Sequence, residues 1–135
     1  MKIYTIKKLD LDSNNFYRGT EDLNDFAGAI EADENLGQVR FELSLKAKFH
    51  ILFKAGSGIK AGSGIEAGDG IKAGDGIKAG CGIKAKKISA RLRIFAGLCI
   101  WRLPTKEEKQ IKCEILESGE IAFGELVLLE KACTA

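Results

Sequence analysis

Five near-identical hexapeptides fill the middle of the chain and constrain its fold more than any other feature. From Ala55 the sequence reads AGSGIK AGSGIE AGDGIK AGDGIK AGCGIK. A helix is excluded because each interior Gly costs about 1 kcal/mol relative to Ala, and every repeat carries two. Collagen needs Gly at every third residue with abundant Pro, and a disordered Gly-rich linker would not keep Ile in register. The repeat therefore predicts a short Ile-Lys-Ala strand followed by a Gly-x-Gly corner, where Gly permits a positive φ.

Strand alternation extends this pattern beyond the perfect repeats. Successive side chains of a strand point to opposite sides, and the odd positions upstream of the repeats are almost all apolar: Val39, Phe41, Leu43, Leu45, Ala47, Phe49, Ile51 and Phe53. The same parity runs through the repeats to residue 85. It shifts by one residue at Lys86-Lys87, after which Ile88, Ala90, Leu92, Ile94, Ala96, Leu98 and Ile100 are predicted to point inward. We interpret the shift as a bulge or an altered corner.

Three hexapeptides per turn give a coil of about 18 residues, and residues 28–103 then make about four coils. The predicted fold is all-β, a short three-sided parallel β-helix (β-solenoid). A flatter, two-sided coil with two hexapeptides per turn is the alternative, less favoured because Phe41, Phe49 and Phe53 need a wider interior. The 18-residue period predicts three stacked pairs: Lys60 with Lys78, Lys54 with Lys72, and Glu66 with Lys84.

Solenoids need covered ends. Residues 1–27 are predicted to form an N-terminal cap and residues 104–135 a C-terminal β-hairpin cap, with ESGE turning between IKCEIL and IAFGELVLL. Both caps belong to one folding unit with the solenoid at 28–103. The alternative for residues 20–30 is a helix capped by Thr20, but Ile30-Glu31-Ala32 repeats the Ile-Glu-Ala of residues 65–67 and favours a solenoid that begins near Gly28.

The hexapeptides resemble those of two groups of β-helical proteins. In the left-handed hexapeptide-repeat acyltransferases a small residue follows an aliphatic one by four positions, as Ser63 follows Ile59 and Cys81 follows Ile77, whereas Asp69 and Asp75 depart from the pattern. That resemblance implies a catalytic His on a loop between subunits, but His50, the chain's one His, is predicted on the outward face of a strand. The run Ile83-Lys84-Ala85-Lys86-Lys87-Ile88 is similar to bactofilin sequences, which implies a self-associating structural scaffold with an open solenoid end.

Composition argues against several other classes. No apolar run approaches the roughly 18 residues of a membrane-spanning helix, and MKIYTIKKLDLD lacks a signal-peptide core. We therefore predict a cytoplasmic protein that does not enter a membrane. Four cysteines (Cys81, Cys99, Cys113 and Cys133) show no CxxC spacing and predict free thiols. Asp69 and Asp75 fall on different corners and are read as solvated turn residues. We predict no metal, no cofactor and no enzymatic activity.

Charge supplies the functional hypothesis. Residues 37–103 carry a net +9, between ends of −4 and −3. The predicted partner-binding residues combine a basic cluster with two outward aromatic side chains: Lys84, Lys86, Lys87, Arg91, Arg93, Phe95, Trp101 and Arg102. Arg beside exposed aromatics suits nucleic acid or an acidic protein surface. In the alternative without a binding site, the hairpin covers Phe95 and Trp101, and the charges only keep the solenoid soluble.

Acidic side chains of the C-terminal segment offer a further alternative, since they could neutralise the basic cluster within the chain: Glu107, Glu108, Glu114, Glu117 and Glu120. The preferred hypothesis is a non-enzymatic interaction protein whose partner is a protein or nucleoprotein complex, or nucleic acid bound by the basic face. A phage or mobile-element inhibitor of host nucleic-acid machinery, of the anti-CRISPR type, would be one such protein. A homo-oligomer is left open.

Overall fold

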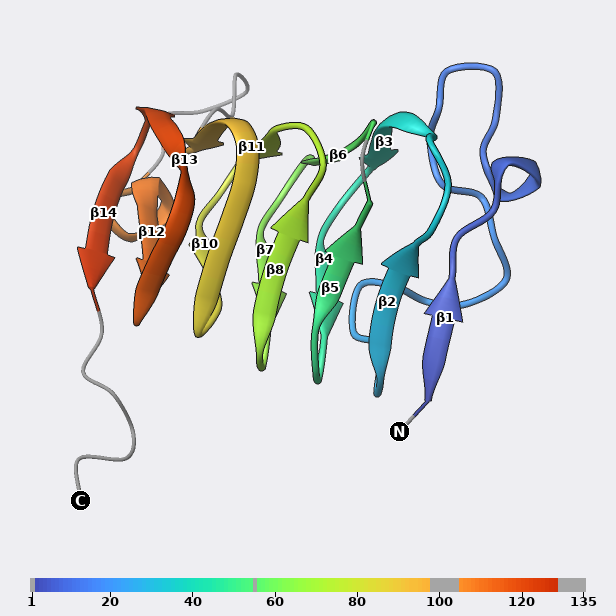
Figure 1. The fold of residues 1–135 in the computed structure, drawn as a ribbon, viewed down its shortest axis with the longest axis horizontal. Helices are drawn as coiled ribbons and strands as arrows, with labels where there is room; N and C mark the ends of the chain where they lie inside the picture. Colours follow the sequence, from blue (N-terminus) through green and yellow to red (C-terminus); the bar gives the residue numbers. More distant parts are fainter. Residues whose placement is uncertain (1, 55, 98–104, 129–135) are drawn as a thin grey trace.

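The computed structural model describes residues 2–54, 56–97 and 105–128, and in it the chain is all-β. All pairings between its named strands are parallel. Within those residues the only helices are two short 3-10 turns, η1 (Lys8–Asp10) and η2 (Glu107–Lys109). Figure 1 shows the strands side by side along the long axis, from β1 at one end to β14 at the other.

The strands form three stacks in which successive members come from successive passes of the chain. Stack 1 contains β1 (Ile3–Thr5), β2 (Ala29–Ala32), β5 (Ile51–Phe53), β8 (Gly70–Ala73) and the first half of β11 (Lys87–Ala96). Stack 2 contains β3 (Gly37–Phe41), β6 (Ser57–Ala61), β9 (Ile77–Ala79) and the second half of β11. Stack 3 contains β4 (Leu45–Ala47), β7 (Ile65–Ala67), β10 (Ile83–Lys84), β12 (Gln110–Cys113) and β14 (Glu125–Leu128).

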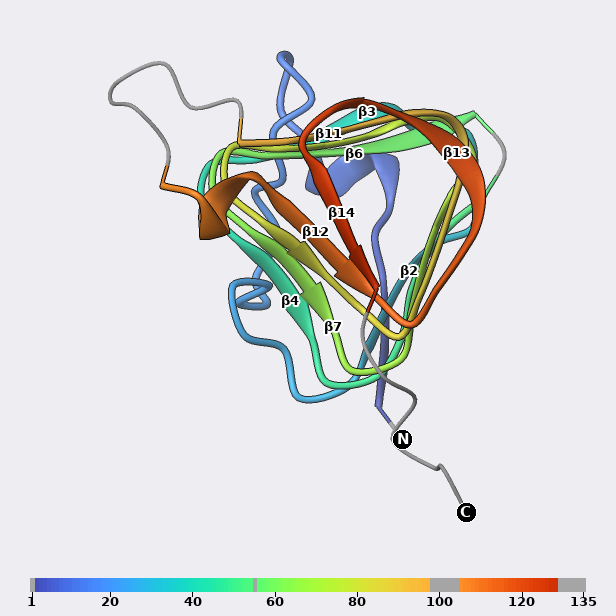
Figure 2. The ribbon, with the colours of Figure 1, turned by 90° about the vertical axis from the view of Figure 1, so that its left-hand side faces the viewer.

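Stacks 1 and 2 are one curled sheet because β11 runs through both. Its first residues pair with β8 and its last with β9, and β13 (Ile115–Phe123) follows β11 around the same corner. Viewed along the stacking direction, the three stacks enclose a common interior with a triangular outline (Figure 2).

Three isoleucine-rich ladders fill that interior, one for each stack. In stack 2, for example, Ile59 pairs with Ile77 and Ile77 with Ile94, and all three are fully buried. Each buried Ile contributes about 1.5–3 kcal/mol relative to an exposed one, so the ladders are the main stabilising feature. The predicted inward parity and its shift at Lys86-Lys87 are confirmed across the strands of the repeat region.

The length of one pass around the interior decreases from β2 to β11. Ile51 pairs with Ile71, Ile59 pairs with Ile77, and Ile77 pairs with Ile94, so each of these passes is shorter than the one before. The longer passes hold buried Phe41 and Phe53, whose later stack partners are Ala. A wider interior therefore goes with a longer pass.

The predicted pairs Lys60–Lys78 and Glu66–Lys84 are confirmed. The predicted pairing of Lys54 with Lys72 is wrong, because the pass at that level is longer than three hexapeptides and brings Leu52 beside Lys72 instead.

Glycine is needed at the corners mainly because the backbones approach closely there. A Cβ placed on Gly80 would lie 2.1 Å from the carbonyl oxygen of Gly62, and one on Gly62 would lie 2.3 Å from that of Glu42. The positive φ predicted for the Gly-x-Gly corners occurs in the described repeats only at Gly56. At the other repeat corners the prediction of a positive φ was wrong, and glycine is needed there because neighbouring parts of the chain approach closely.

Two predicted inward residues and the C-terminal hairpin also need correction. Leu43 and Leu92 are 62% and 53% exposed, because both lie at corners where strand alternation is interrupted. Residues 110–128 form no hairpin: β12 and β13 pair in parallel with β10 and β11, and β14 pairs in parallel with β12. Gly119, with a φ of +111°, lies within β13 where that strand follows the bend of β11. Leu98 and Ile100 lie outside the described residues.

Parallel pairing also occurs outside residues 28–103, in β1 near the N-terminus and in β12 to β14. Residues 20–28 form no helix. Instead, the N-terminal segment makes isolated parallel bridges to stacks 2 and 3, from Phe16 to Arg40 and from Phe26 to Ala47.

Candidate binding face

The structure divides the predicted partner-binding cluster among different sides of the molecule. Lys84 lies on the outer side of stack 3, Lys86 lies at the corner after it, and Lys87 begins β11 on stack 1. Trp101 and Arg102 lie outside the described residues. The cluster was assembled from neighbours in the sequence, but each corner of the chain moves the next strand to another stack.

Acidic neighbours neutralise two of these lysines. Lys86 Nζ lies 3.8 Å from Asp69 Oδ1, and Lys87 Nζ lies 3.7 Å from Glu117 Oε1. Pairing of Lys87 with Glu117 is the intramolecular neutralisation considered as an alternative above. These two lysines are therefore poorer candidates for a partner site than the sequence suggested.

Three of the predicted residues do come together, on stack 2 and its corner with stack 1. Arg91 and Arg93 are exposed where β11 bends, and Phe95 is half-buried on the outer side of stack 2. With Gln38, Gly76, Leu92, Gly119 and the acidic Glu120, which is the register partner of Arg93, they line an open hollow of about 670 Å³. Glycine at position 76 leaves the floor of this hollow without a side chain.

Stack 2 adds a row of cations that the sequence-based site did not include. Arg40, Lys60 and Lys78 are register partners on the adjacent strands β3, β6 and β9. Burial, together with the charges of Lys78 and Arg40, lowers the pKa of Lys60. The row is therefore close enough for like charges to oppose one another.

The cations of this row also lack ion pairs with acidic side chains among the described residues. Among the described residues, no ion pair involves the three cations of the row or the two arginines at its corner. Like charges directly opposite one another in a sheet are destabilising, so this face carries an uncompensated electrostatic cost.

Aromatic rings continue the row at both ends. Phe95 is the register partner of Lys78, and Phe123, which is 42% exposed, is the register partner of Phe95. At the other end Phe16 bridges Arg40, and the guanidinium of Arg40 lies 5.6 Å from the ring centroid. We refer to the whole row as the basic-aromatic column: Phe16, Arg40, Lys60, Lys78, Phe95 and Phe123.

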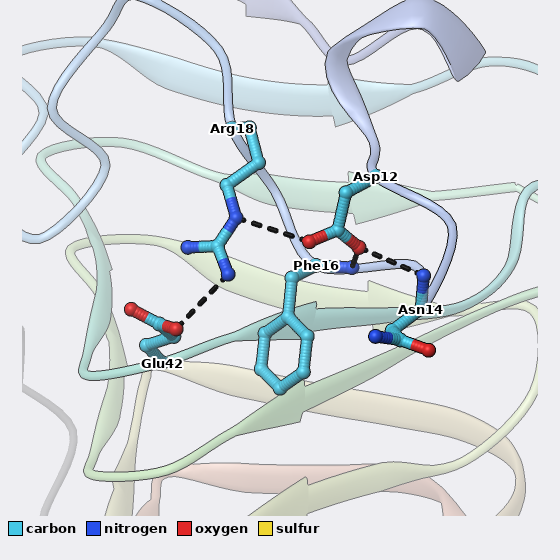
Figure 3. Close-up of polar contacts among 5 residues, drawn as sticks. All are labelled: Asp12, Asn14, Phe16, Arg18 and Glu42. Atoms are coloured by element: carbon cyan, nitrogen blue, oxygen red, sulfur yellow. Dashed lines mark hydrogen bonds and ion pairs between the residues drawn. The ribbon is translucent and has the colours of Figure 1, made fainter.

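A polar network holds the loop that carries Phe16 (Figure 3). Asp12 Oδ1 accepts hydrogen bonds from the backbone N–H of Phe16 and of Asn14, both at 2.9 Å. Arg18 joins Asp12 to Glu42, with Nε 3.1 Å from Asp12 Oδ2 and Nη2 3.0 Å from Glu42 Oε1. The Phe16 amide lowers the pKa of Asp12, and Arg18 lowers the pKa of Glu42.

A strip of small residues runs beside the column. The outward positions two before Lys60 and Lys78 are Gly58 and Gly76. A Cβ at Gly58 would lie 2.3 Å from Gln38 Nε2, so the Gln38 side chain occupies the space above that glycine. Gly58 is therefore covered, and of these two glycines only Gly76 lines the hollow described above.

The column was visible in the sequence only in part. Its Lys60–Lys78 step follows from the three-hexapeptide period, but Arg40 joins through a longer pass and Phe16 through an isolated bridge. Strand alternation is continuous from Val39 and places Arg40 on the outer side. If passes of different lengths had been allowed, this alternation could have placed Arg40 beside Lys60.

His50 is half-buried and paired, whereas the sequence predicted a solvated side chain. Its Nε2 lies 2.6 Å from Glu31 Oε2, and both line a hollow of about 360 Å³ on stack 1. The Cys81 thiol donates a hydrogen bond to Glu108 Oε2 at 3.5 Å, and burial raises the pKa of the Cys113 thiol. Cys99 and Cys133 lie outside the described residues.

No helix among the described residues has the length and apolar character needed to cross a bilayer. Comparisons of the chain with protein-family models, curated proteins and solved structures find no match.

Proposed function

We propose that this chain is a non-enzymatic binding protein whose basic-aromatic column receives a polyanionic macromolecular partner. The observation that carries the proposal is the row of Arg40, Lys60 and Lys78, which lie side by side without an acidic partner among the described residues. A fold gains nothing from such a row, because the three charges repel one another. A partner with negative charges at matching intervals would offset that cost.

A short three-sided β-helix is the architecture we infer for the scaffold. Parallel pairing of strands from successive passes of the chain, on three stacks around one interior, supports this inference. A rigid scaffold of this kind would hold the cations at fixed spacing without the partner's help. Preorganisation of that sort lowers the entropic cost of binding.

Within this proposal, an inhibitor encoded by a phage or mobile element is one specific case. Such a protein would use the column to occupy the nucleic-acid-binding surface of a host complex, or the nucleic acid itself. The net charge of +9 on residues 37–103 supports attraction to either. Cytoplasmic location is part of the same proposal.

The test is a tagged pull-down from bacterial lysate with and without nuclease, using wild type and a Lys60→Glu/Lys78→Glu variant. A matched control is Lys84→Glu/Lys112→Glu, since these lysines are also register partners on adjacent strands but lie on stack 3. We expect wild type and the control to recover the same acidic or nucleoprotein species, and the stack 2 variant to lose them. Equal recovery by all three proteins would contradict the proposal.

Self-association is a second candidate function, favoured by the C-terminal end of the stacks. No described strand covers the outer edges of β13 and β14, and Leu126 and Leu128 there are 37% and 63% exposed. Open apolar strand edges promote pairing with another chain, as a bactofilin-like scaffold would require. Negative-stain microscopy of wild type should then show end-to-end assemblies that Leu128→Lys disperses and that Leu43→Lys, at an exposed corner, leaves intact.

A further inference from the structure

We propose that the polyanion recognised by the basic-aromatic column is a single-stranded nucleic acid. Its phosphates would lie along Arg40, Lys60 and Lys78, and its bases would contact the rings at either end and the adjoining hollow. This inference rests on the proposed function and narrows its partner to one chemical class.

The dimensions of the column fit a short single strand. Strands of a sheet lie about 4.8 Å apart, so its six register positions span about 24 Å. That length accommodates roughly four nucleotides, the lower end of the site sizes known for compact single-strand-binding domains. Arg91 and Arg93 border the hollow lined by Phe95 and add two cations that form no ion pair among the described residues, although Glu120 lines the same hollow.

Aromatic rings in the same row distinguish a nucleic acid from an acidic protein. An acidic peptide would neutralise the cations but would leave the ring of Phe95 without a stacking partner, whereas the Phe16 ring is already contacted by Arg18 and Arg40. Unpaired bases stack on such rings whatever their sequence, and this stacking adds to the backbone electrostatics. The hollow beside Phe95, at about 670 Å³, has room for a base.

The flat outer side of stack 2 argues for a single strand over a duplex. Proteins read the major groove of duplex DNA with a protruding helix or a two-stranded ribbon, and among the described residues no such element extends from β3, β6 or β9. In a duplex, moreover, the base faces are stacked on one another and cannot reach Phe95. Single strands expose those faces.

Fluorescence anisotropy with a labelled 15-mer of mixed sequence tests the inference, with the same strand annealed to its complement as competitor. We expect the single strand to bind at least tenfold more tightly than the duplex. If three to five phosphates are contacted, the logarithm of the binding constant should fall against the logarithm of salt concentration with a slope between about −2 and −3.5. Lys60→Glu/Lys78→Glu should abolish binding, whereas Lys84→Glu/Lys112→Glu should leave it within threefold of wild type.

Phe95→Leu keeps an apolar side chain but removes the ring, and should weaken single-strand binding by at least about fivefold. Phe49→Leu is its control, because Phe49 is a half-buried ring at a corner away from the column. Equal binding of duplex and single strand, or an unchanged affinity in Phe95→Leu, would overturn the inference.

Failure of this inference can be separated from failure of the proposed function. If the oligonucleotide does not bind but a nuclease-resistant protein is recovered by wild type and lost with Lys60→Glu/Lys78→Glu, the partner is an acidic protein and only the nucleic-acid inference is wrong. If neither the oligonucleotide nor any lysate component depends on Lys60 and Lys78, both proposals are wrong.

Discussion

Stacks 1 and 2 share a curled sheet and a strand, yet their outer surfaces differ in how their charged side chains are paired. On stack 1, His50 contacts Glu31 and Lys87 contacts Glu117. On stack 2, the row from Arg40 to Lys78 has no acidic partner among the described residues. Because β11 passes through both stacks, the difference does not come from the backbone. The interior residues determine the fold, while the outward residues are free to specialise.

The largest expected effect concerns what the two stacks have in common. Ile71 of stack 1 and Ile77 of stack 2 occupy equivalent, fully buried positions in their ladders. Replacing either with Ala should lower the free energy of unfolding by roughly 2–5 kcal/mol, through lost burial and a residual cavity. Urea denaturation should give two losses that differ by no more than about 2 kcal/mol, the spread found among core truncations of one kind. A much smaller loss at one of them would show that the two stacks do not share an equivalent core.

Removing a single positive charge should change the free energy of unfolding differently on the two stacks. Lys60→Met keeps the aliphatic stem but relieves repulsion from Arg40 and Lys78, and should raise the free energy of unfolding by roughly 0.2–1 kcal/mol. Lys87→Met removes the pair with Glu117 and should leave the free energy unchanged or lower it by up to about 1 kcal/mol. Chemical denaturation in low salt measures both. The comparison fails if Lys60→Met is destabilising.

The dependence of stability on pH offers a finer version of the same test. The folded pKa of Lys60 is lowered, so the unfolded chain holds this proton more tightly and the electrostatic cost is fully present at neutral pH. Stability should therefore rise with pH between the lowered folded pKa and the ordinary lysine value near about 10.4. Over that window the stability advantage of Lys60→Met over wild type should shrink, as measured by denaturation from neutral pH upward. A constant difference would indicate that the variant acts through packing.

Sequence reasoning predicted the shared interior far better than the differing surfaces. Parity along the chain identified the buried residues of the strands because alternation is local, and it failed at Leu43 and Leu92, where corners interrupt the alternation. The parallel arrangement of residues 110–128 was missed because a turn such as ESGE suits a hairpin and a solenoid corner equally well.

The candidate site depends on register, a long-range property. A single insertion or deletion in a pass changes which outward side chains meet. Arg40 and Lys60 became neighbours although a full pass of the chain separates them, while the adjacent Lys86 and Lys87 were paired with Asp69 and Glu117. Neighbours in the sequence were therefore a poor guide to neighbours on the surface.

The smallest expected effect concerns the loop that brings Phe16 to the column. Asp12→Ala removes the acceptor for the Phe16 and Asn14 amides and the partner of Arg18. Hydrogen exchange at Phe16 should become faster and single-strand affinity should fall by about two- to fivefold, with little change in global unfolding because the network is exposed.

In wild type the same loosening should appear at low pH. The folded pKa of Asp12 is lowered, so its stabilising contacts are present at neutral pH and are lost as the pH falls through that value. Asp22→Ala is the matched control, because Asp22 likewise accepts a nearby backbone amide, from Asn24, but lies away from Phe16. If both variants loosen Phe16 equally, the Asp12 network does not position the ring, and stack 2 binds its partner through the cations and Phe95 alone.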